Sequence, residues 1–238
     1  FFFKQKTAYE IPKRDWNSDV CSSDLASGET ETSWATTLEE ALALAPDHVS
    51  AYALTIEPGT ALGRAVAAGD APPPDGDVQA DRFLAACETF RAGGFEHYEV
   101  SNWARPGRES RHNLRYWRRE PYLGLGAGAH AFRGDRRWWN VRPPHEYLER
   151  VAAGQRPIGG EETLTPEQAA FEALSLGLRI RDGVPVGPLD AEALERHVAA
   201  GLLTVVAGRA VATEAGWLVL NSLVLDLERP LALSPGDC

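Results

Sequence analysis

Residues 101–140 hold the side chains with the most distinctive chemistry in the sequence. Nine arginines stand against three acidic residues there, inside a chain whose formal net charge is −10. Seven large aromatic residues are interleaved with these arginines. Aromatic rings stack on flat ligands, and guanidinium groups pair bidentately with carboxylate or phosphate. The segment predicts a flat anionic ligand, either a porphyrin or stacked single-stranded nucleic acid, unless it is an arginine-rich loop over packed aromatic residues.

His112 lies within this segment, in the sequence RHNLRYW that covers residues 111–117. A neutral imidazole is a common axial ligand of heme iron. Its second nitrogen needs a hydrogen-bond partner that fixes the tautomer, and Asn113 is a neighbouring candidate. A lone histidine is more often structural, so the residue type by itself leaves both interpretations open.

Residues 122–130 (YLGLGAGAH) contain the spacing GxGxxA of dinucleotide-binding loops. Such a loop needs a strand before it and a long helix after it, and no helical period follows His130. We therefore interpret the glycines as positions where the backbone approaches a ligand or a neighbouring strand.

The elements before this segment read as alternating helices and strands. Residues 34–45 repeat apolar side chains at helical spacing, and residues 48–56 form a mostly apolar strand of the kind buried on both faces. A second helix is expected over residues 78–92, and a strand over residues 95–101. A helix that leads into a buried strand is half of a βαβ unit, so the pattern predicts a parallel sheet.

A second module follows Gly154. Thr165 and Gln168 form a capping box around a proline at the first helical position. The remaining pattern is a helix, a hairpin and a last helix, the layout of a winged-helix-like module. The expected ranges are 190–201 for the second helix, 202–206 and 210–213 for the hairpin, and 217–227 for the last helix.

Composition restricts the function classes. The 238 residues are 44% hydrophobic and 24% charged, as in globular proteins. An acidic chain is not drawn to nucleic acid, and the second helix of the winged-helix-like module is itself acidic. No apolar run approaches the roughly 20 residues of a membrane span, and no export signal is present, so we expect a cytoplasmic protein without an integral membrane segment. Cys21, Cys87 and Cys238 form no CxxC pair, and Cys87 is expected in the core.

Residues 1–25 differ in character from the rest. Residues 4–10 and 15–25 back-translate to the two constant blocks of a short-read sequencing adapter, with Asn17 as the departure. No sustained apolar period of 2 or 3.6 runs through them. We expect a non-native tail that packs against nothing, the alternative being a genuine N-terminus.

Six sequence blocks, in order along residues 26–228, resemble the HemW-type heme chaperones. These proteins belong to the radical S-adenosylmethionine family that resembles oxygen-independent coproporphyrinogen III oxidase. HNxxYW is the most specific block, and it separates the chaperones from the true coproporphyrinogen dehydrogenases. The blocks are HVSAY (48–52), TIEPGT (55–60), YEVSN (98–102), ARPG (104–107), HNLRYW (112–117) and GLGAGAH (124–130).

The resemblance implies an α/β fold, the C-terminal part of an incomplete TIM-like radical barrel followed by the winged-helix-like domain. The domains expected are a tail over 1–25, the barrel remainder with the arginine and aromatic region over 26–155, and the C-terminal domain over 156–238. Heme contact is implied at His112, Asn113, Arg115, Tyr116 and Trp117, with His112 as the possible iron ligand. Weaker S-adenosylmethionine contact is implied at Thr55, Glu57, Gly126, Gly128 and His130.

The sequence also departs from the family pattern. The family holds a 4Fe–4S cluster on CxxxCxxC, and this sequence contains no such motif. We therefore expect a fragment without a cluster and without radical chemistry, whose open barrel edge promotes aggregation. The leading hypothesis is a heme chaperone with acceptor hemoproteins as partners, and a homodimer is left open. The alternative is an oxidase that decarboxylates coproporphyrinogen III by radical chemistry.

Overall fold

The computed structural model describes residues 19–24 and 29–228. Contacts divide the chain into two compact units between Glu109 and Ser110. The expected domain limits at residues 25 and 155 stay predictions.

The first unit is built on a four-stranded sheet in the order β1-β2-β4-β3. Only the β1–β2 pair is parallel, and the other pairs are antiparallel. The prediction of a parallel sheet is therefore right for that pair alone. The chain turns back directly after β3, and β4 inserts between β3 and β2. The strands are β1 (Asp19–Asp24), β2 (His48–Ala53), β3 (Glu96–Glu99) and β4 (Asn102–Ala104).

β1 corrects the expectation that residues 1–25 pack against nothing. Its six residues pair with the whole of β2, from Asp19 opposite His48 to Asp24 opposite Ala53. An unpaired strand edge offers a row of free N–H and C=O groups to any extended segment, whatever its side chains. The expected open edge of β2 is therefore occupied. Residues 1–18 and Leu25 lie outside the described residues.

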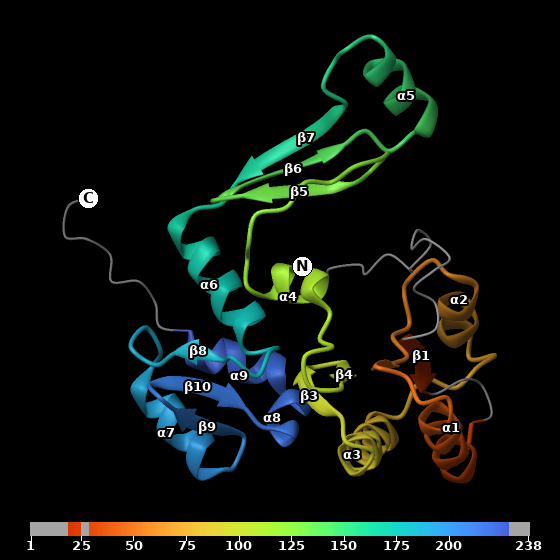
Figure 1. Ribbon diagram of the computed structural model, residues 1–238, viewed down its shortest axis with the longest axis vertical. Helices are drawn as coiled ribbons and strands as arrows, with labels where there is room; N and C mark the ends of the chain where they lie inside the picture. The colour runs from red at the N-terminus through yellow and green to blue at the C-terminus, as the bar shows by residue number, and fades with distance from the viewer. Residues whose placement is uncertain (1–18, 25–28, 229–238) are drawn as a thin grey trace. The chain divides into compact units, whose positions relative to one another are not determined.

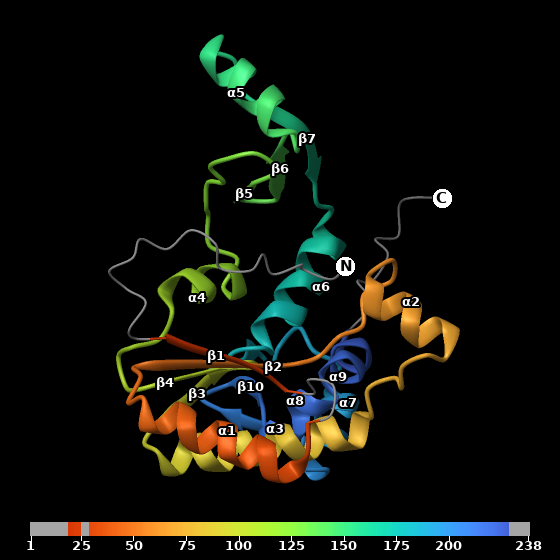
Figure 2. The ribbon, with the colours of Figure 1, turned by 90° about the vertical axis from the view of Figure 1, so that its right-hand side faces the viewer.

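Two helices cover one face of this sheet. α1 (Glu31–Ala43) and α3 (Gly76–Ala92) lie side by side along it (Figure 2). The core between helices and strands is apolar and contains Cys87 at 1% exposure, as predicted. α2 (Ala61–Ala68), which the sequence pattern did not predict, begins at the capping Thr60. The core cluster consists of Trp34, Leu38, Val49, Ala86, Cys87, Phe90, Phe95 and Trp103.

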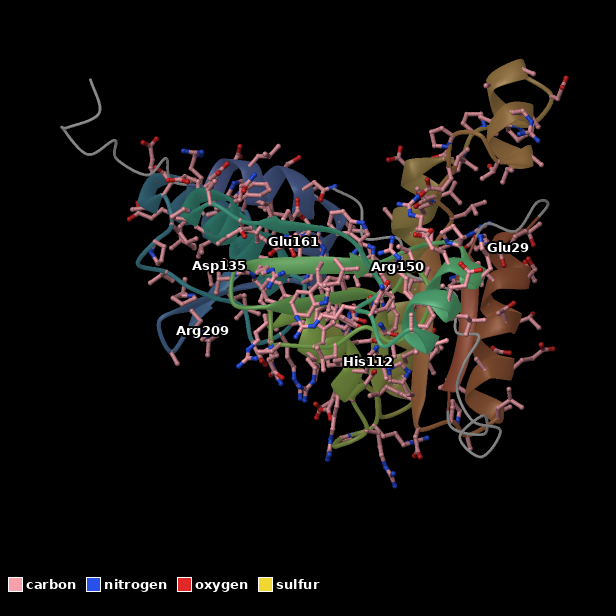
Figure 3. The ribbon with its side chains drawn as sticks, turned by 90° about the horizontal axis from the view of Figure 1, so that it is seen from above. Glu29, His112, Asp135, Arg150, Glu161 and Arg209 are labelled. Carbon is pink, nitrogen blue, oxygen red and sulfur yellow. The ribbon has the colours of Figure 1, made fainter. Side chains whose placement is uncertain are left out.

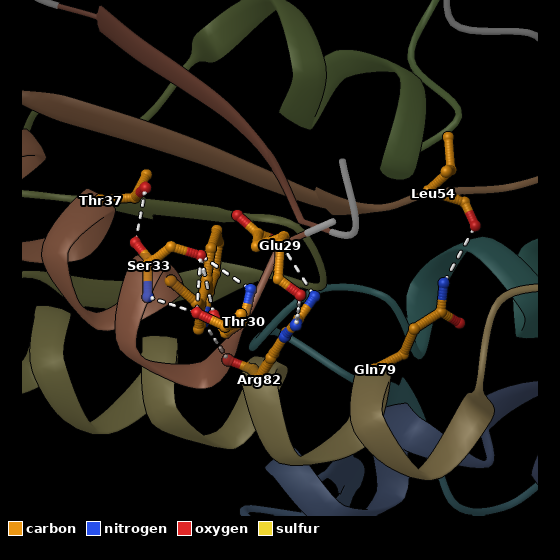
Figure 4. A network of polar contacts seen from close by, with 8 residues as sticks. Glu29, Thr30, Ser33, Thr37, Leu54, Gln79 and Arg82 are labelled. Atoms are coloured by element: carbon orange, nitrogen blue, oxygen red, sulfur yellow. Dashed lines mark hydrogen bonds and ion pairs between the residues drawn. The ribbon is translucent and has the colours of Figure 1, made fainter. Parts of the chain in front are cut away.

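A buried arginine fixes the start of α1 (Figure 4). Arg82 of α3 donates to the Glu29 carboxylate at 3.0 Å and to its backbone carbonyl at 2.9 Å. Thr30 and Ser33 then form a capping box. Because buried charges are costly without a partner, the Glu29–Arg82 pair ties the loop before α1 to α3.

The second unit begins with a short helix and a three-stranded antiparallel sheet (Figure 1). The sheet order is β5-β6-β7, and α5 lies at the end of the sheet remote from α4 and α6. Sequence reasoning predicted none of these strands. Their bounds are α4 (Arg111–Trp117), β5 (His130–Arg133), β6 (Arg136–Asn140), α5 (Pro144–Ala152) and β7 (Ile158–Thr163).

The rest of the second unit has the predicted order of helix, helix, hairpin and helix. The capping box at Thr165 and Gln168 is present. Two features were not predicted: a short strand that joins the hairpin, and a break at Val219 that splits the last helix. The elements are α6 (Pro166–Gly177), β8 (Val184–Pro185), α7 (Ala191–Ala199), β9 (Leu203–Val206), β10 (Arg209–Ala212), α8 (Glu214–Leu218) and α9 (Leu220–Leu227).

Among residues 19–24 and 29–228, no helix combines the length and apolar character that crossing a membrane requires. None of the three sheets in the described part of the chain closes on itself, in agreement with an incomplete barrel.

Candidate functional site

α4 carries the five residues predicted to contact heme. Ser110 caps the helix by accepting the Asn113 amide at 3.3 Å, directly after the turn at Pro106 and Gly107. The helix ends at Trp117 with Arg118 as its C-cap, and the following Arg119 has the left-handed φ of 53°. The amides of Arg119 and Glu120 satisfy the last carbonyls of the helix, as in a Schellman-type ending.

The five predicted residues divide between two faces of α4. Successive helical residues are rotated by about 100°, so His112, Arg115 and Tyr116 share one face. Asn113 and Trp117 lie on the adjacent face. The His112 side chain is exposed, and Figure 3 marks its place.

Tyr116, rather than Asn113, is the hydrogen-bond partner of the histidine. The Tyr116 hydroxyl lies 3.0 Å from His112 Nε2, one helical turn away. The rings meet edge to face, with centroids 4.8 Å apart. Asn113 instead contributes its backbone amide to the helix cap. The imidazole is therefore oriented from within its own helix.

Aromatic contacts continue from Tyr116 into the sheet. Tyr116 meets Tyr122 edge to face at 4.6 Å, and Tyr122 lies 6.2 Å from Phe132 of β5. Tyr122 and Phe132 also exchange two backbone hydrogen bonds. The α4 face that carries His112 is thus anchored to β5 through two tyrosine rings.

Burial raises the pKa of both tyrosines. Desolvation raises the pKa of Tyr116. It is also the largest cause for Tyr122, where Tyr116 and Glu172 raise the pKa further and Arg137 opposes them. Both phenols are therefore neutral hydrogen-bond donors at physiological pH.

A carboxylate clamp joins α4, β6 and α6. Glu172 of α6 accepts from Arg119 Nε at 3.0 Å and from Arg137 Nη2 at 2.7 Å. These three side chains are only 16–18% exposed, so solvent screens the pairs weakly. The Arg119 guanidinium also stacks over Phe132 at 5.2 Å. The clamp holds the C-terminal end of α4 against the sheet.

The arginines in and next to α4 differ in whether they form ion pairs. Arg115 pairs with Glu120 at 3.8 Å, with both side chains roughly half exposed. Arg118 pairs with Asp182 at 2.7 Å. Arg111 is exposed and makes no ion pair with any residue the structure describes. Arg111 and Arg115 are therefore the guanidinium groups of α4 available to an anionic ligand.

The Trp117 indole presents an unused donor. Its Nε1 atom is buried and has no hydrogen-bond partner within the described part of the chain. A buried donor without a partner costs about 1–3 kcal/mol, which a ligand acceptor would offset.

The glycine-rich loop after Tyr122 is held mainly by its own unit. Buried Asn140 donates to the carbonyls of Gly124 and Gly126, at 3.2 and 2.8 Å. The Gly126 amide donates to the Tyr147 hydroxyl, and the Gly128 amide to the Val141 carbonyl. A side chain at Gly124 would overlap the backbone of His130. Close approach to a neighbouring strand therefore explains Gly124, one of the two interpretations left open by the sequence.

The residues predicted to contact S-adenosylmethionine lie in different units. Thr55 and Glu57 are exposed in the loop that follows β2, where α/β folds collect ligands at strand C-termini. His130 begins β5 and lies 5.7 Å from Trp139. Gly126 has a φ of 101° with open space at its Cα, but the amides of Gly126 and Gly128 are already bonded.

Sequence reasoning missed Glu172, Asn140 and Tyr147, whose side chains hold α4 and the glycine-rich loop in place. Glu172 follows the predicted capping box on an ordinary helical face, and nothing in its spacing indicates two arginine partners. Asn140 is the best marked of the three, because a buried asparagine after two tryptophans must bond to backbone.

Comparison with known proteins gives relatives of one kind. The heme chaperone HemW of Mycobacterium tuberculosis is 41% identical over 203 residues, covering 84% of this chain and 52% of that protein. HemW of Bacillus subtilis is 36% identical over 147 residues, covering 62% and 39%. A Danio rerio protein, radical S-adenosyl methionine domain-containing protein 1, mitochondrial, is 35% identical over 165 residues, covering 66% and 37%. The chain spans about half the length of the curated relatives it matches.

The fold has a counterpart among solved structures. Coproporphyrinogen III oxidase (HemN) from Escherichia coli, a radical SAM enzyme, aligns with a TM-score of 0.68 at 18% identity. The alignment covers 91% of this chain and 56% of that one. No family model matches the sequence.

Proposed function

From its homology to the HemW heme chaperones, we propose that this chain binds heme at α4 and delivers it to acceptor hemoproteins. The single observation that carries the proposal is the exposed His112 imidazole on a helix face shared with Arg115. A cytoplasmic location and a homodimer belong to the same proposal. The sequence identity to HemW heme chaperones supports the heme role, and the geometry of α4 supports its place.

Heme is the cargo in this proposal, and the side chains of α4 suit both its iron and its propionates. A histidine nitrogen is a common ligand for the iron. Guanidinium groups bind the propionates, and the Arg115–Glu120 pair is weak enough to exchange for one because exposed pairs contribute about 0–1 kcal/mol. Tyr116 and Trp117 would lie against the macrocycle, and Asn113 would flank it.

The same proposal extends to S-adenosylmethionine with less support. Thr55 and Glu57 have exposed polar groups that could contact the ligand. The backbone amides of Gly126 and Gly128 are already hydrogen-bonded, so these glycines would contribute no free donors, and Gly126 would contribute open space for the ligand. His130 would contribute a ring beside Trp139. The sequence contains no CxxxCxxC, so its residues do not fit a 4Fe–4S cluster.

Hemin titration followed by the Soret band tests the heme site. Ligation by a histidine nitrogen should shift the band, and His112→Ala should abolish the shift and weaken binding. His197→Ala is the matched control, since His197 pairs with Asp226 between α7 and α9 and should leave both unchanged. Arg115→Glu should lower affinity without changing the ligation spectrum, because it replaces attraction to a propionate by repulsion.

Competing ligands are tested in the same titration. His130 is exposed beside Trp139, whereas His97 stacks on Trp103 at 4.1 Å within the first unit. His130→Ala and His97→Ala should leave the shift intact. Wild-type spectrum and affinity in His112→Ala would place the heme elsewhere.

The second candidate, a coproporphyrinogen III oxidase, is favoured by the likeness of fold to HemN alone. Turnover of coproporphyrinogen III by the protein with its complete cluster motif would support that activity. The HNxxYW block and the higher identity to HemW favour the chaperone.

A further inference from the structure

The two nitrogens of His112 are unequal before any heme arrives. Nε2 lies 3.0 Å from the Tyr116 hydroxyl, and the two residues occupy successive turns of one helix. The two rings meet edge to face, with an interplanar angle of 84°. Nε2 is the nitrogen at the outer end of the ring, where a bulky macrocycle has the best access to it.

Chemistry sets the direction of this hydrogen bond. A phenol is a strong donor, and the imidazole lone pair is a strong acceptor. A tyrosine hydroxyl keeps its proton at neutral pH, because the pKa of a phenol is ordinarily about 10. With the phenol as the donor to Nε2, the ring proton of neutral His112 resides on Nδ1.

The Tyr116 ring is fixed in place by its neighbours. Tyr122 packs edge to face against it, and Tyr122 is in turn joined to Phe132 of β5 by backbone hydrogen bonds. Because the donor is held by the sheet, the bond to His112 re-forms whenever Nε2 becomes vacant.

We propose that Tyr116 guards the His112 lone pair, occupying Nε2 in the heme-free protein and competing with iron for it. The proposal rests on heme binding at His112 as set out above. Iron must displace the hydroxyl to bind, and the hydroxyl regains Nε2 when heme leaves. The guard therefore weakens capture and favours release, which suits a protein that must give its cargo away.

The competition predicts a tighter complex when the hydroxyl is removed. A hydrogen bond of this kind has a net free energy that corresponds to about a two- to tenfold change in an equilibrium constant. Tyr116→Phe should therefore bind hemin about two- to tenfold more tightly. It should also pass hemin to apomyoglobin more slowly by a similar factor.

Tyr122→Phe is the matched control for this variant. It removes a hydroxyl from the adjacent ring, with the same loss of one oxygen, and that hydroxyl makes no hydrogen bond to His112 among the described contacts. Its hemin affinity should equal that of the wild type. Nitrogen-15 spectra of the heme-free wild type should show the proton of His112 on Nδ1, and Tyr116→Phe should shift the Nε2 resonance.

The outcomes separate this inference from the proposed function. Tighter hemin binding by Tyr116→Phe supports the guard. Weaker or unchanged binding overturns it, as does a wild-type spectrum with the proton on Nε2, because the phenol would then orient the ring for ligation through Nδ1. Unchanged binding by His112→Ala would instead overturn the heme site itself, whatever Tyr116→Phe does.

Discussion

The carboxylate clamp can be tested by changing Glu172 to glutamine. Glutamine keeps the size of the side chain and one acceptor oxygen, but it removes the charge that both guanidinium groups share. Arg119 and Arg137 approach that carboxylate at 3.0 and 2.7 Å, with less than a fifth of each side chain exposed. The substitution therefore leaves two nearly buried cations around a neutral amide.

The expected loss follows from the bonds removed. A hydrogen bond to a charged partner contributes about 1.5–3 kcal/mol, and glutamine loses one such bond while weakening the other. Arg137 retains Glu162 at 3.1 Å, which limits the damage. We expect Glu172→Gln to lower the free energy of opening of α4 by about 2 kcal/mol, which is about a thirtyfold change in the opening equilibrium.

Amide hydrogen exchange measures that opening directly. The amides of Leu114 and Arg118, which bond within α4, should exchange about thirtyfold faster in Glu172→Gln. Glu161→Gln is the control, since its pair with Arg136 is about half exposed and should change exchange by less than about fivefold. Equal effects of the two substitutions would refute the view that the clamp is what holds α4.

Three further predictions concern other parts of the molecule. Gly124→Ala should destabilise the second unit by about 2 kcal/mol or more in urea unfolding, because its Cβ overlaps His130, whereas Gly134→Ala meets open space and should cost about 1 kcal/mol. The contribution of Tyr116 and Tyr122 to the stability of the second unit should be constant below about pH 10 and fall as pH rises through their raised pKa values, because the phenols of the unfolded chain ionise first. Constant stability in alkaline unfolding would contradict this. Deletion of residues 1–24 should free the edge of β2 and produce self-association in sedimentation velocity, and a monodisperse truncated chain would contradict this.

The sequence predicts helices best where an amphipathic face or a cap marks them. The capping box at Thr165 and the apolar face from Trp34 to Leu38 both lie where expected, because local bonds and the helical period determine them. α4 was missed, although Ser110 and the His112–Tyr116 spacing mark a cap and a helical turn. Its seven residues are too few for an apolar period to emerge.

Pairing between distant segments was not predictable from the sequence. The insertion of β4 between β2 and β3 depends on the turn after Glu99, whose own residues look like a continuing strand. β6 has the sequence RRWWN, two arginines followed by two tryptophans, so it lacks the alternation of polar and apolar residues that usually marks a strand. At the site, the five residues predicted to contact heme do lie on one helix. The hydrogen-bond partner of His112, however, depends on the direction of the side chains and not on proximity in sequence.

The occupation of β2 by β1 has a consequence for behaviour at high concentration. β1 is joined to β2 through α1, so pairing within the chain competes with pairing between chains at an effective concentration in the millimolar range. Purified protein at about micromolar concentration lies far below that range, and the tethered strand reaches the edge first. β1 therefore competes with other chains for the edge of β2. Association through this edge should begin only when the protein concentration approaches the effective concentration of the tethered β1.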